Sequence, residues 1–456
     1  MNLVHWHVFS LFDHYYLFDT PSNSLFQIDR PTYLRLKTEA LPEEATSYQD
    51  QLVTEFSAET IDEIEDEIKA LRESGYLVAA DPFLEHPTFE LKPELKALCL
   101  HLAHDCQLRC TYCFAGGGAF GGDQSLMSPE VGRAALDYLF AASGEKDHLE
   151  VDFFGGEPLL NKELMVELVR YGEEKAARLG KQIHFTLTTN TLALNRELLQ
   201  FLQEHRMGLV LSLDGREQVN DRMRGKGTYR RIVPRIQEVI RDFPDLNYYV
   251  RGTYTRYNLD FAADVKHFYD LGFRSISIEP VVCAPDLPYA LRDEDLPAIF
   301  AEYDRLAEYY WQKYQTGEGF RFFHFNVELE KGPCLPKRIL GCGAGFDYLA
   351  VTPHGELYPC HQFVGEQDYC LGNVFTGLAA AETRETFCQA RLYAKEGCNE
   401  CWARYYCSGG CHAHAYFANG SILKPNQMAC VLMRKRLECA LALNAMRLAE
   451  ESKNAR

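Results

Sequence analysis

Three cysteines lie within eight positions of the chain, at Cys106, Cys110 and Cys113, in the spacing C-x3-C-x2-C. They follow an apolar run at 98–102 and precede a glycine-rich segment at 116–122. A closed structural zinc site uses four ligands, and iron–sulfur clusters are normally held by four thiolates. Three thiolates therefore predict a metal centre with one coordination position left open for a substrate or cofactor.

A second set of cysteines with ligand-like spacing occupies the C-terminal third. A G-x4-C pattern ends at one of them, and a C-x2-C-x5-C-x3-C pattern follows. The set comprises Cys334, Cys342, Cys360, Cys398, Cys401, Cys407, Cys411 and Cys430. Sixteen cysteines in a chain without a recognisable secretion signal argue against a disulfide scaffold and favour metal binding in a reducing cytoplasm. Spacing alone does not separate zinc from iron.

Other candidate site residues follow expected strands. Gly155, Gly156, Glu157 and Pro158 come directly after one strand, where glycines allow a close approach and the carboxylate could accept a hydrogen bond from an ammonium group. Ser212 ends a later strand, and Arg231 lies near the start of a helix. Arg251 and Glu279 are expected at the ends of two further strands. A plain turn and solvated surface positions are the alternatives for these residues.

Strand-like and helix-like segments alternate between residues 97 and about 325, which predicts an α/β fold with a parallel sheet and crossover helices. The expected strands are 98–103, 149–154, 183–188, 209–213, 248–254 and 275–281. The expected helices are 129–142, 162–179, 196–205, 231–241 and 261–271. Ligand-binding loops belong at the carboxyl ends of such strands, and the three-cysteine loop follows the first one.

Residues 1–90 read as a separate small module. Aromatic and β-branched runs at 4–12 and 15–18 predict a hairpin, 24–28 a third strand, and 61–71 a helix. A loop is expected over 39–55 and a strand-like end at 75–78. The module is predicted to be winged-helix-like. It is either an accessory cap or a peptide-recognition domain whose edge strand, within 20–30, accepts an added strand from a partner.

The net charge of −18 and a pI near 5.3 disfavour nucleic acid or an anionic membrane surface as a partner. No window approaches 18 uninterrupted apolar residues, so no membrane span is expected. The first residues lack a basic segment, and charged and histidine residues interrupt their apolar run, so no signal peptide is expected. These features together predict a cytoplasmic protein.

The C-x3-C-x2-C motif with Tyr112 before its last cysteine, together with the GGEP sequence at 155–158, resembles the radical S-adenosylmethionine (SAM) enzymes. The C-terminal cysteine pattern resembles the SPASM extension of that family. The segments 98–106, 151–158, 341–343 and 406–411 are further similar to the SCIFF maturases. Those enzymes install thioether cross-links, often to Thr, in Cys-rich ribosomal peptides.

The resemblance implies a partial (β/α)6 radical SAM barrel at 91–325. It places a winged-helix-like precursor-recognition domain at 1–90, a SPASM domain with two auxiliary clusters at 326–440, and a helical tail at 441–456. SAM would chelate the open iron of the Cys106/Cys110/Cys113 cluster, with the GGEP residues at its amino group, Ser212 near its ribose and Arg231 at its carboxylate.

Three [4Fe–4S] clusters are implied in all. Cys342, Cys360 and Cys411 would hold the first auxiliary cluster, with Cys334 either its fourth ligand or a bystander. Cys398, Cys401, Cys407 and Cys430 would hold the second. The implied partners are a Cys-rich precursor peptide bound through its leader and a one-electron reductant such as flavodoxin or ferredoxin. The alternatives are an anaerobic sulfatase-maturase-like enzyme that oxidises a Cys or Ser side chain, and a non-catalytic iron–sulfur or zinc scaffold.

Overall fold

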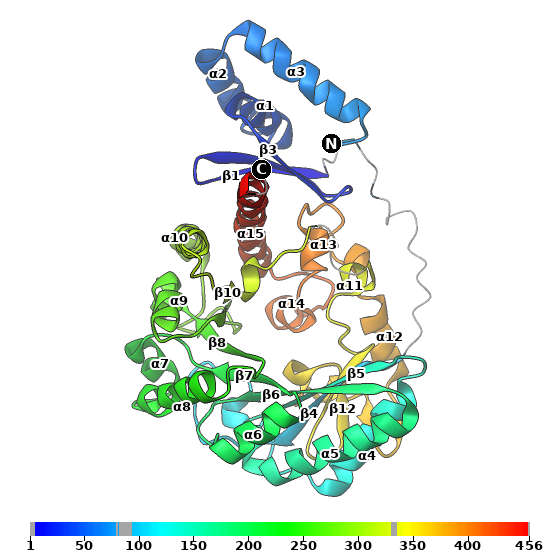
Figure 1. Cartoon of the computed structure of the whole chain (residues 1–456). Coiled ribbons are helices and arrows are strands. Elements are labelled where there is room, and N and C mark those ends of the chain that lie inside the picture. The colour runs from blue at the N-terminus through cyan, green and yellow to red at the C-terminus, as the bar shows by residue number, and fades with distance from the viewer. Residues whose placement is uncertain (1–4, 79–80, 82–93, 330–334, 455–456) are drawn as a thin grey trace.

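The computed structural model describes residues 5–78, 81, 94–329 and 335–454. Figure 1 shows a small module at one end of the molecule, a large α/β layer at the other, and a long C-terminal helix that reaches from the second to the first. Among the described residues, no helix is both long and apolar enough to cross a membrane.

The N-terminal module is a three-stranded antiparallel sheet followed by three helices. The strands are β1 (Trp6–Leu11), β2 (His14–Asp19) and β3 (Ser24–Ile28), in the order β1-β2-β3. The helices are α1 (Arg30–Ala40), α2 (Ala45–Glu55) and α3 (Ala58–Glu73). Phe12 and Asp13 form the two-residue turn of the first hairpin, both with positive φ, as a type I′ turn requires.

Both faces of this sheet are buried, which explains its dense aromatic and β-branched sequence. Val8 and Leu17 pack with Leu36 and Ile68 of the module's own helices. Phe9 and Tyr16, on the opposite face, join the core of the main body.

Two expectations for this module are wrong. The segment expected as a loop at 39–55 contains α2, because Leu52 is buried against Leu34 of α1 and Ile64 of α3 and anchors an otherwise polar helix. Residues 75–78 form turns instead of a strand.

The main body has a mainly parallel sheet. Its six expected strands are present and are ordered consecutively as β4 (Ala97–Ala103), β5 (His148–Gly155), β6 (Gln182–Thr189), β7 (Gly208–Ser212), β8 (Tyr248–Tyr254) and β9 (Ser275–Pro280). Helices cover their outer face in Figure 1: α4 (Pro129–Ala142), α5 (Lys162–Leu179), α6 (Arg196–Glu204), α7 (Glu217–Arg224), α8 (Thr228–Asp242), α9 (Phe261–Asp270) and α10 (Leu296–Gln315). The α/β prediction is confirmed.

Alternation along the strands separates an apolar outer face from a more polar inner face. Leu98, Leu100 and Leu102 of β4 lie in the core beneath the helices. Cys99, between them, pairs in register with Asp152 of β5. Because successive side chains point to opposite faces, Cys99 and Asp152 face the interior of the barrel.

The sheet is wider than expected. The short strand β10 (Arg321–Phe322) adds to β9, and β11 (Tyr348–Val351) pairs in parallel with β4. The antiparallel strands β12 (Glu356–Tyr358), β13 (Gly372–Asn373) and β14 (Gly377–Leu378) extend it further. The barrel therefore stays open, and the C-terminal cysteine region begins as a continuation of the same sheet.

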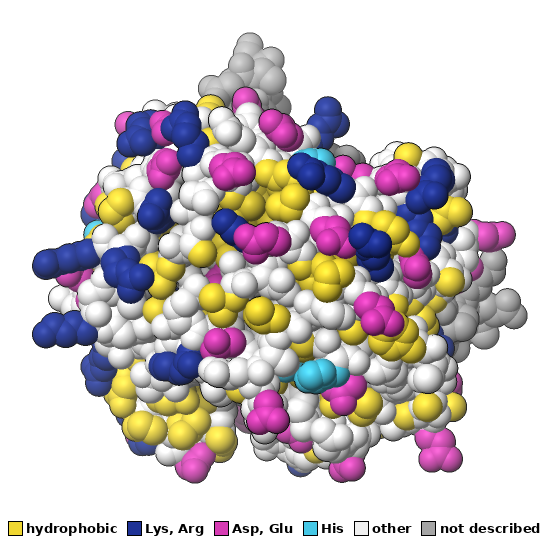
Figure 2. Space-filling model, turned by 90° about the horizontal axis from the view of Figure 1, so that it is seen from below, with side chains coloured by type: hydrophobic (Ala, Val, Ile, Leu, Met, Phe, Trp, Pro, Cys, Tyr) yellow, Lys and Arg dark blue, Asp and Glu magenta, His cyan; other side chains and the backbone are white. Residues whose placement is uncertain are grey.

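The remaining helices are α11 (Leu335–Leu340), α12 (Ala381–Gln389), α13 (Arg404–Cys407), α14 (His412–Asn419) and α15 (Gln427–Asn454). The helix α15 begins earlier than the expected tail at 441 and includes Cys430. It is partly buried, because Leu437 and 439–443 lie against α10 and neighbouring segments. Figure 2 shows one outer face of the molecule, where acidic and basic side chains are scattered among hydrophobic ones.

Candidate metal and cofactor site

The three-cysteine loop leaves β4 at the carboxyl edge of the sheet and is held by the glycines that follow β5. The Gly156 N–H donates to the carbonyl of Ala103 (2.8 Å), and the Glu157 N–H to that of Asp105 (2.8 Å). A Cβ atom at Gly156 would collide with the Asp105 carbonyl and lie 2.8 Å from the Cα of Gly118. The close approach expected of these glycines is therefore made by the backbone of the cysteine loop.

The Cys106 sulfur atom of this loop has partners that suit a metal-bound thiolate. The Cys106 Sγ accepts from the Leu108 N–H at 3.4 Å and faces the Asn190 Nδ2 at 3.6 Å. Burial raises the pKa of Cys106, and it raises that of Cys110 to about 11. Iron coordination deprotonates such thiols outright, and hydrogen bonds to sulfur tune the cluster. The donor set therefore fits an iron–sulfur group with three protein thiolates.

Tyr112 fixes the loop to the neighbouring strands. Its hydroxyl donates to the carboxylate of Asp214, at 2.8 and 2.7 Å from the two oxygens. Asp214 is completely buried and also accepts from Arg224 at 3.0 Å and from the Thr253 N–H at 3.1 Å. The Arg224 charge opposes the rise that burial causes in the pKa of Cys110. This buried network connects the loop to β7, β8 and α7.

Glu157 is buried and bridges the ends of β5 and β6. Its Oε1 accepts from the Thr189 hydroxyl at 2.7 Å and from the Leu159 N–H at 3.1 Å, and its Oε2 accepts from the Asn190 N–H at 2.8 Å. Burial raises its pKa to about 7, and these hydrogen bonds oppose that rise. In the structure the carboxylate organises the strand ends, and its expected contact with the SAM amino group stays a prediction.

Ser212 and Arg251 are paired in register on β7 and β8, and Arg251 is paired with Ser277 on β9. Glu279, two residues further along β9, shares that inner face. Arg251 was expected at the end of its strand, but it lies in the middle of β8. Its side chain is exposed. Arg231 is exposed on the first turns of α8. Its assignment to the SAM carboxylate stays a prediction.

Charged side chains from distant segments meet Glu279. Its carboxylate lies 2.9 Å from the His324 Nε2 and 3.6 Å from an Arg436 nitrogen of α15. These groups and Arg251 hold the pKa of Glu279 far below its usual range. Arg251 also lowers the pKa values of His361 and His414, both to about 4, although burial is the larger cause. The contacts of Glu279 with His324 and Arg436 join the barrel to the C-terminal region.

The C-terminal thiols fall into two groups by their mutual electrostatic interactions. Cys360 interacts with Cys342 and Cys411. Cys398 interacts with Cys401, Cys407 and Cys430. The ligand sets expected from the resemblance are thus brought together, and their role as cluster ligands stays a prediction. Cys334 lies outside the described residues, and among the described ones no three Cys, His, Asp or Glu side chains converge on a single metal ion.

One contact places the first of these groups beside the three-cysteine loop. His361, the residue after Cys360, lies against Phe154 of β5 and Phe114, the residue after Cys113, with ring centroids 4.9 and 5.7 Å apart. His361 also contacts the hydroxyl of Tyr348 at 3.2 Å. Cys360, the neighbour of His361, therefore lies in the segment that packs beside the loop.

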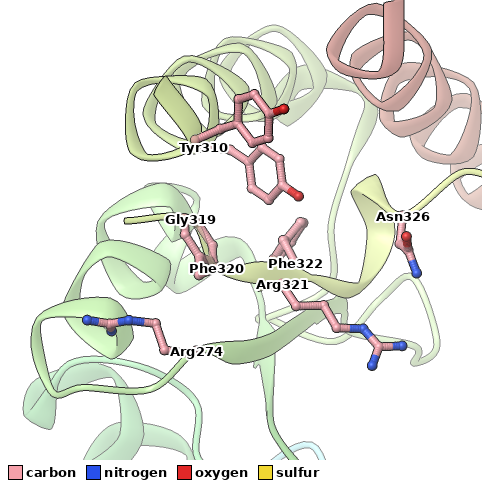
Figure 3. A pocket seen from close by; sticks show the side chains of 8 residues that line it. Arg274, Tyr310, Gly319, Phe320, Arg321, Phe322 and Asn326 are labelled. Atoms are coloured by element: carbon pink, nitrogen blue, oxygen red, sulfur yellow. The ribbon is translucent and has the colours of Figure 1, made fainter. Parts of the chain in front are cut away.

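A cavity of about 290 Å³ lies elsewhere. Aromatic side chains of α10 and of 320–322 gather around it, with Arg274 and Arg321 at its sides (Figure 3). Arg274 comes directly before β9, and Arg321 is the first residue of β10. The cavity therefore lies at the amino ends of these two strands. It contains none of the candidate site residues.

Two protein-family models match parts of this chain. A model of the radical SAM superfamily matches residues 100–255, and a model of the SPASM iron–sulfur cluster-binding domain matches 342–402. The chain carries a radical SAM domain followed by a SPASM domain. Its homologues include SPASM-type maturases.

The radical SAM cyclopropyl synthase TigE of Paramaledivibacter caminithermalis is 21% identical over 430 residues, 85% of each chain. The serine-type anaerobic sulfatase-maturating enzyme of Klebsiella aerogenes is 25% identical over 388 residues, 78% of this chain and 87% of its own. The solved structure of native anSMEcpe with bound AdoMet superposes with a TM-score of 0.63 at 19% identity, covering 79% of this chain and 100% of the other.

Sequence reasoning missed Asp214 and Arg224. Asp214 follows the strand that ends at Ser212, and that position at a carboxyl strand end was the available signal. Its partner Tyr112 lies 102 residues away, so no local pattern could connect them.

Proposed function

We propose that this protein is a radical SAM peptide maturase that forms thioether cross-links in a Cys-rich precursor peptide of the SCIFF type. The acceptor would be a carbon of another residue, often Thr. The contact of the His361 ring with the rings of Phe114 and Phe154 carries the proposal, because His361 follows Cys360 and Phe114 follows Cys113.

Bound SAM and a reduced cluster on Cys106, Cys110 and Cys113 would supply a 5′-deoxyadenosyl radical that abstracts hydrogen from the acceptor carbon. The side chains of this chain would do the rest. Tyr112, Asp214 and Arg224 hold the loop, and Glu157 fixes the strand ends beside it. A peptide thiol held near Cys360 and Cys411 would lie opposite the acceptor carbon. Forming the C–S bond removes two hydrogen atoms from the peptide, one to deoxyadenosine and the other as a proton and an electron that an auxiliary cluster would accept.

The N-terminal module would bind the leader of the precursor. β3 is an edge of its sheet, and an edge strand offers unpaired backbone groups to an added strand. The reductant would be a flavodoxin or ferredoxin, and the reaction would take place in the cytoplasm.

A second candidate is the oxidation of a Cys or Ser side chain, as in anaerobic sulfatase maturases. The similarity to the Klebsiella aerogenes enzyme over 78% of this chain favours it. Both reactions remove two hydrogen atoms, so the two functions differ in their product: a cross-link turns a thiol into a thioether that joins two residues, whereas oxidation of a Cys or Ser side chain gives a thiocarbonyl or carbonyl group on one residue.

Anaerobic reconstitution tests the proposal. About twelve irons per chain are expected for three [4Fe–4S] clusters, with deoxyadenosine formed from SAM after addition of dithionite. The variant Cys106→Ala/Cys110→Ala/Cys113→Ala should keep about eight irons and lose deoxyadenosine formation. Co-expression with a candidate Cys-rich precursor peptide, followed by mass spectrometry and thiol alkylation, would distinguish the two products. Zinc in place of iron, or no deoxyadenosine, would contradict the proposal.

A further inference from the structure

Lys395 is a buried lysine that lies between the two groups of C-terminal thiols. Only 3% of its surface is exposed. Its ammonium donates to the carbonyls of Gly409 at 2.8 Å and Gly410 at 3.4 Å, in the segment between Cys407 and Cys411. The side chain passes so close to Gly409 that a Cβ there would lie 2.9 Å from the Lys395 Cδ. The glycine and the lysine therefore fit each other.

The two carbonyl groups that this ammonium contacts do not neutralise its positive charge. In the part of the chain that the structure describes, it makes no ion pair with a carboxylate. Burial lowers its pKa, and negative charge on Cys342, Cys398, Cys407 and Cys411 opposes that shift. These cysteines belong to both groups, two to each. A buried cation without a counter-ion is costly, so the anionic partner should be the thiolates themselves.

We propose that Lys395 is the shared counter-ion of the two auxiliary clusters and sets both of their reduction potentials. The inference rests on the proposed function, because it requires clusters on these thiols. A thiolate-ligated cluster becomes more negative when it is reduced, so a nearby positive charge stabilises the reduced form. A single lysine between both groups would raise the two potentials together and keep them close, which suits electron transfer between them.

The test is an anaerobic potentiometric titration of the reconstituted full chain, monitored by electron paramagnetic resonance. The Cys106→Ala/Cys110→Ala/Cys113→Ala background leaves only the auxiliary signals. Lys395→Met should lower both midpoint potentials by at least 59 mV, a tenfold change in the ratio of reduced to oxidised cluster for one electron. Lys395→Arg, which keeps the charge, should shift them less. Lys424→Met removes an exposed lysine of the same region and should leave both unchanged.

The outcomes separate the two proposals. Intact auxiliary clusters with unchanged potentials in Lys395→Met, or a shift in only one of them, would overturn the counter-ion role and leave the proposed function standing. Zinc or no cluster in the wild-type chain would overturn both. If Lys395→Met loses auxiliary iron, retention in Lys395→Arg supports the role of charge. Equal loss in both variants would mean that the shape of the side chain matters, and would overturn the inference.

Discussion

Asp152, a single inward-facing residue, is expected to make the free energy of unfolding depend on pH. It lies on β5 opposite Cys99, and burial raises its pKa to about 6, with the nearby charge of Glu150 adding to the rise. Between pH values of about 4 and 6 the native state keeps a proton that the unfolded chain has already lost. The free energy of unfolding therefore falls as the pH rises through this window.

Asp152→Asn should abolish that fall. Because the variant has no carboxyl group to ionise, it should gain roughly 1 to 3 kcal/mol of stability relative to the wild type as the pH rises from 4 to 7. Urea unfolding at a series of pH values measures the difference between the two proteins. Asp245→Asn, at an exposed position, is the matched control and should follow the wild type. A constant difference across the pH range would contradict the assignment to Asp152.

At the scale of elements, the spacing of apolar residues predicted the six main strands and the helices between them. These segments are long and strongly patterned, and each buries a continuous apolar face, as Leu98, Leu100 and Leu102 do. The segment at 45–55 was not predictable in this way. Its helix depends mainly on Leu52, whose partners lie on α1 and α3.

The loop around the second thiol group is held to the rest of the chain by a buried ion pair. The Arg404 Nε lies 3.0 Å from the carboxylate of Asp81, and both side chains are buried. Tyr393 also donates to that carboxylate, at 3.0 Å. Arg404 lies between Cys401 and Cys407, so this pair fixes Asp81 to the thiol-bearing loop.

Removing one partner should be costly, because a buried charge then stays unpaired. Asp81→Asn is expected to lower the free energy of unfolding by about 3 to 5 kcal/mol and to weaken retention of the iron assigned to the second auxiliary cluster. Thermal unfolding and iron content after a chelator challenge measure the two effects. Asp242→Asn breaks a surface pair with Arg196 and should cost less than about 1 kcal/mol. An equal effect of both substitutions would show that burial of the Asp81 pair is unimportant.

At the scale of the whole molecule, the organisation depends on pairings between segments far apart in sequence. β11 joins β4 across about 250 residues, and α15 contacts β1 and β3 of the N-terminal module as well as α10 of the main body. His7 of β1 stacks on Trp402, between Cys401 and Cys407, with ring centroids 4.0 Å apart. Such contacts follow from complementary surfaces and leave no periodic signal in the sequence. The motifs therefore predicted the local ligand spacing but not this assembly.

The assembly suggests a truncation that separates recognition from chemistry. A chain that begins after Val78 lacks the three-stranded sheet and its helices but keeps Asp81, whose loss would leave Arg404 unpaired. It should retain about twelve irons and form deoxyadenosine within about twofold of the full chain, because the three-cysteine loop is held by β5, β7 and β8. Modification of the precursor should fall at least tenfold, since the edge strand proposed to bind the leader is gone.

The full chain given a peptide without its leader should show the same loss, and this serves as the reciprocal control. If the truncated enzyme cross-links the complete precursor at the rate of the full chain, the module has no role in recognition, and its packing on Trp402 and α15 would be purely structural.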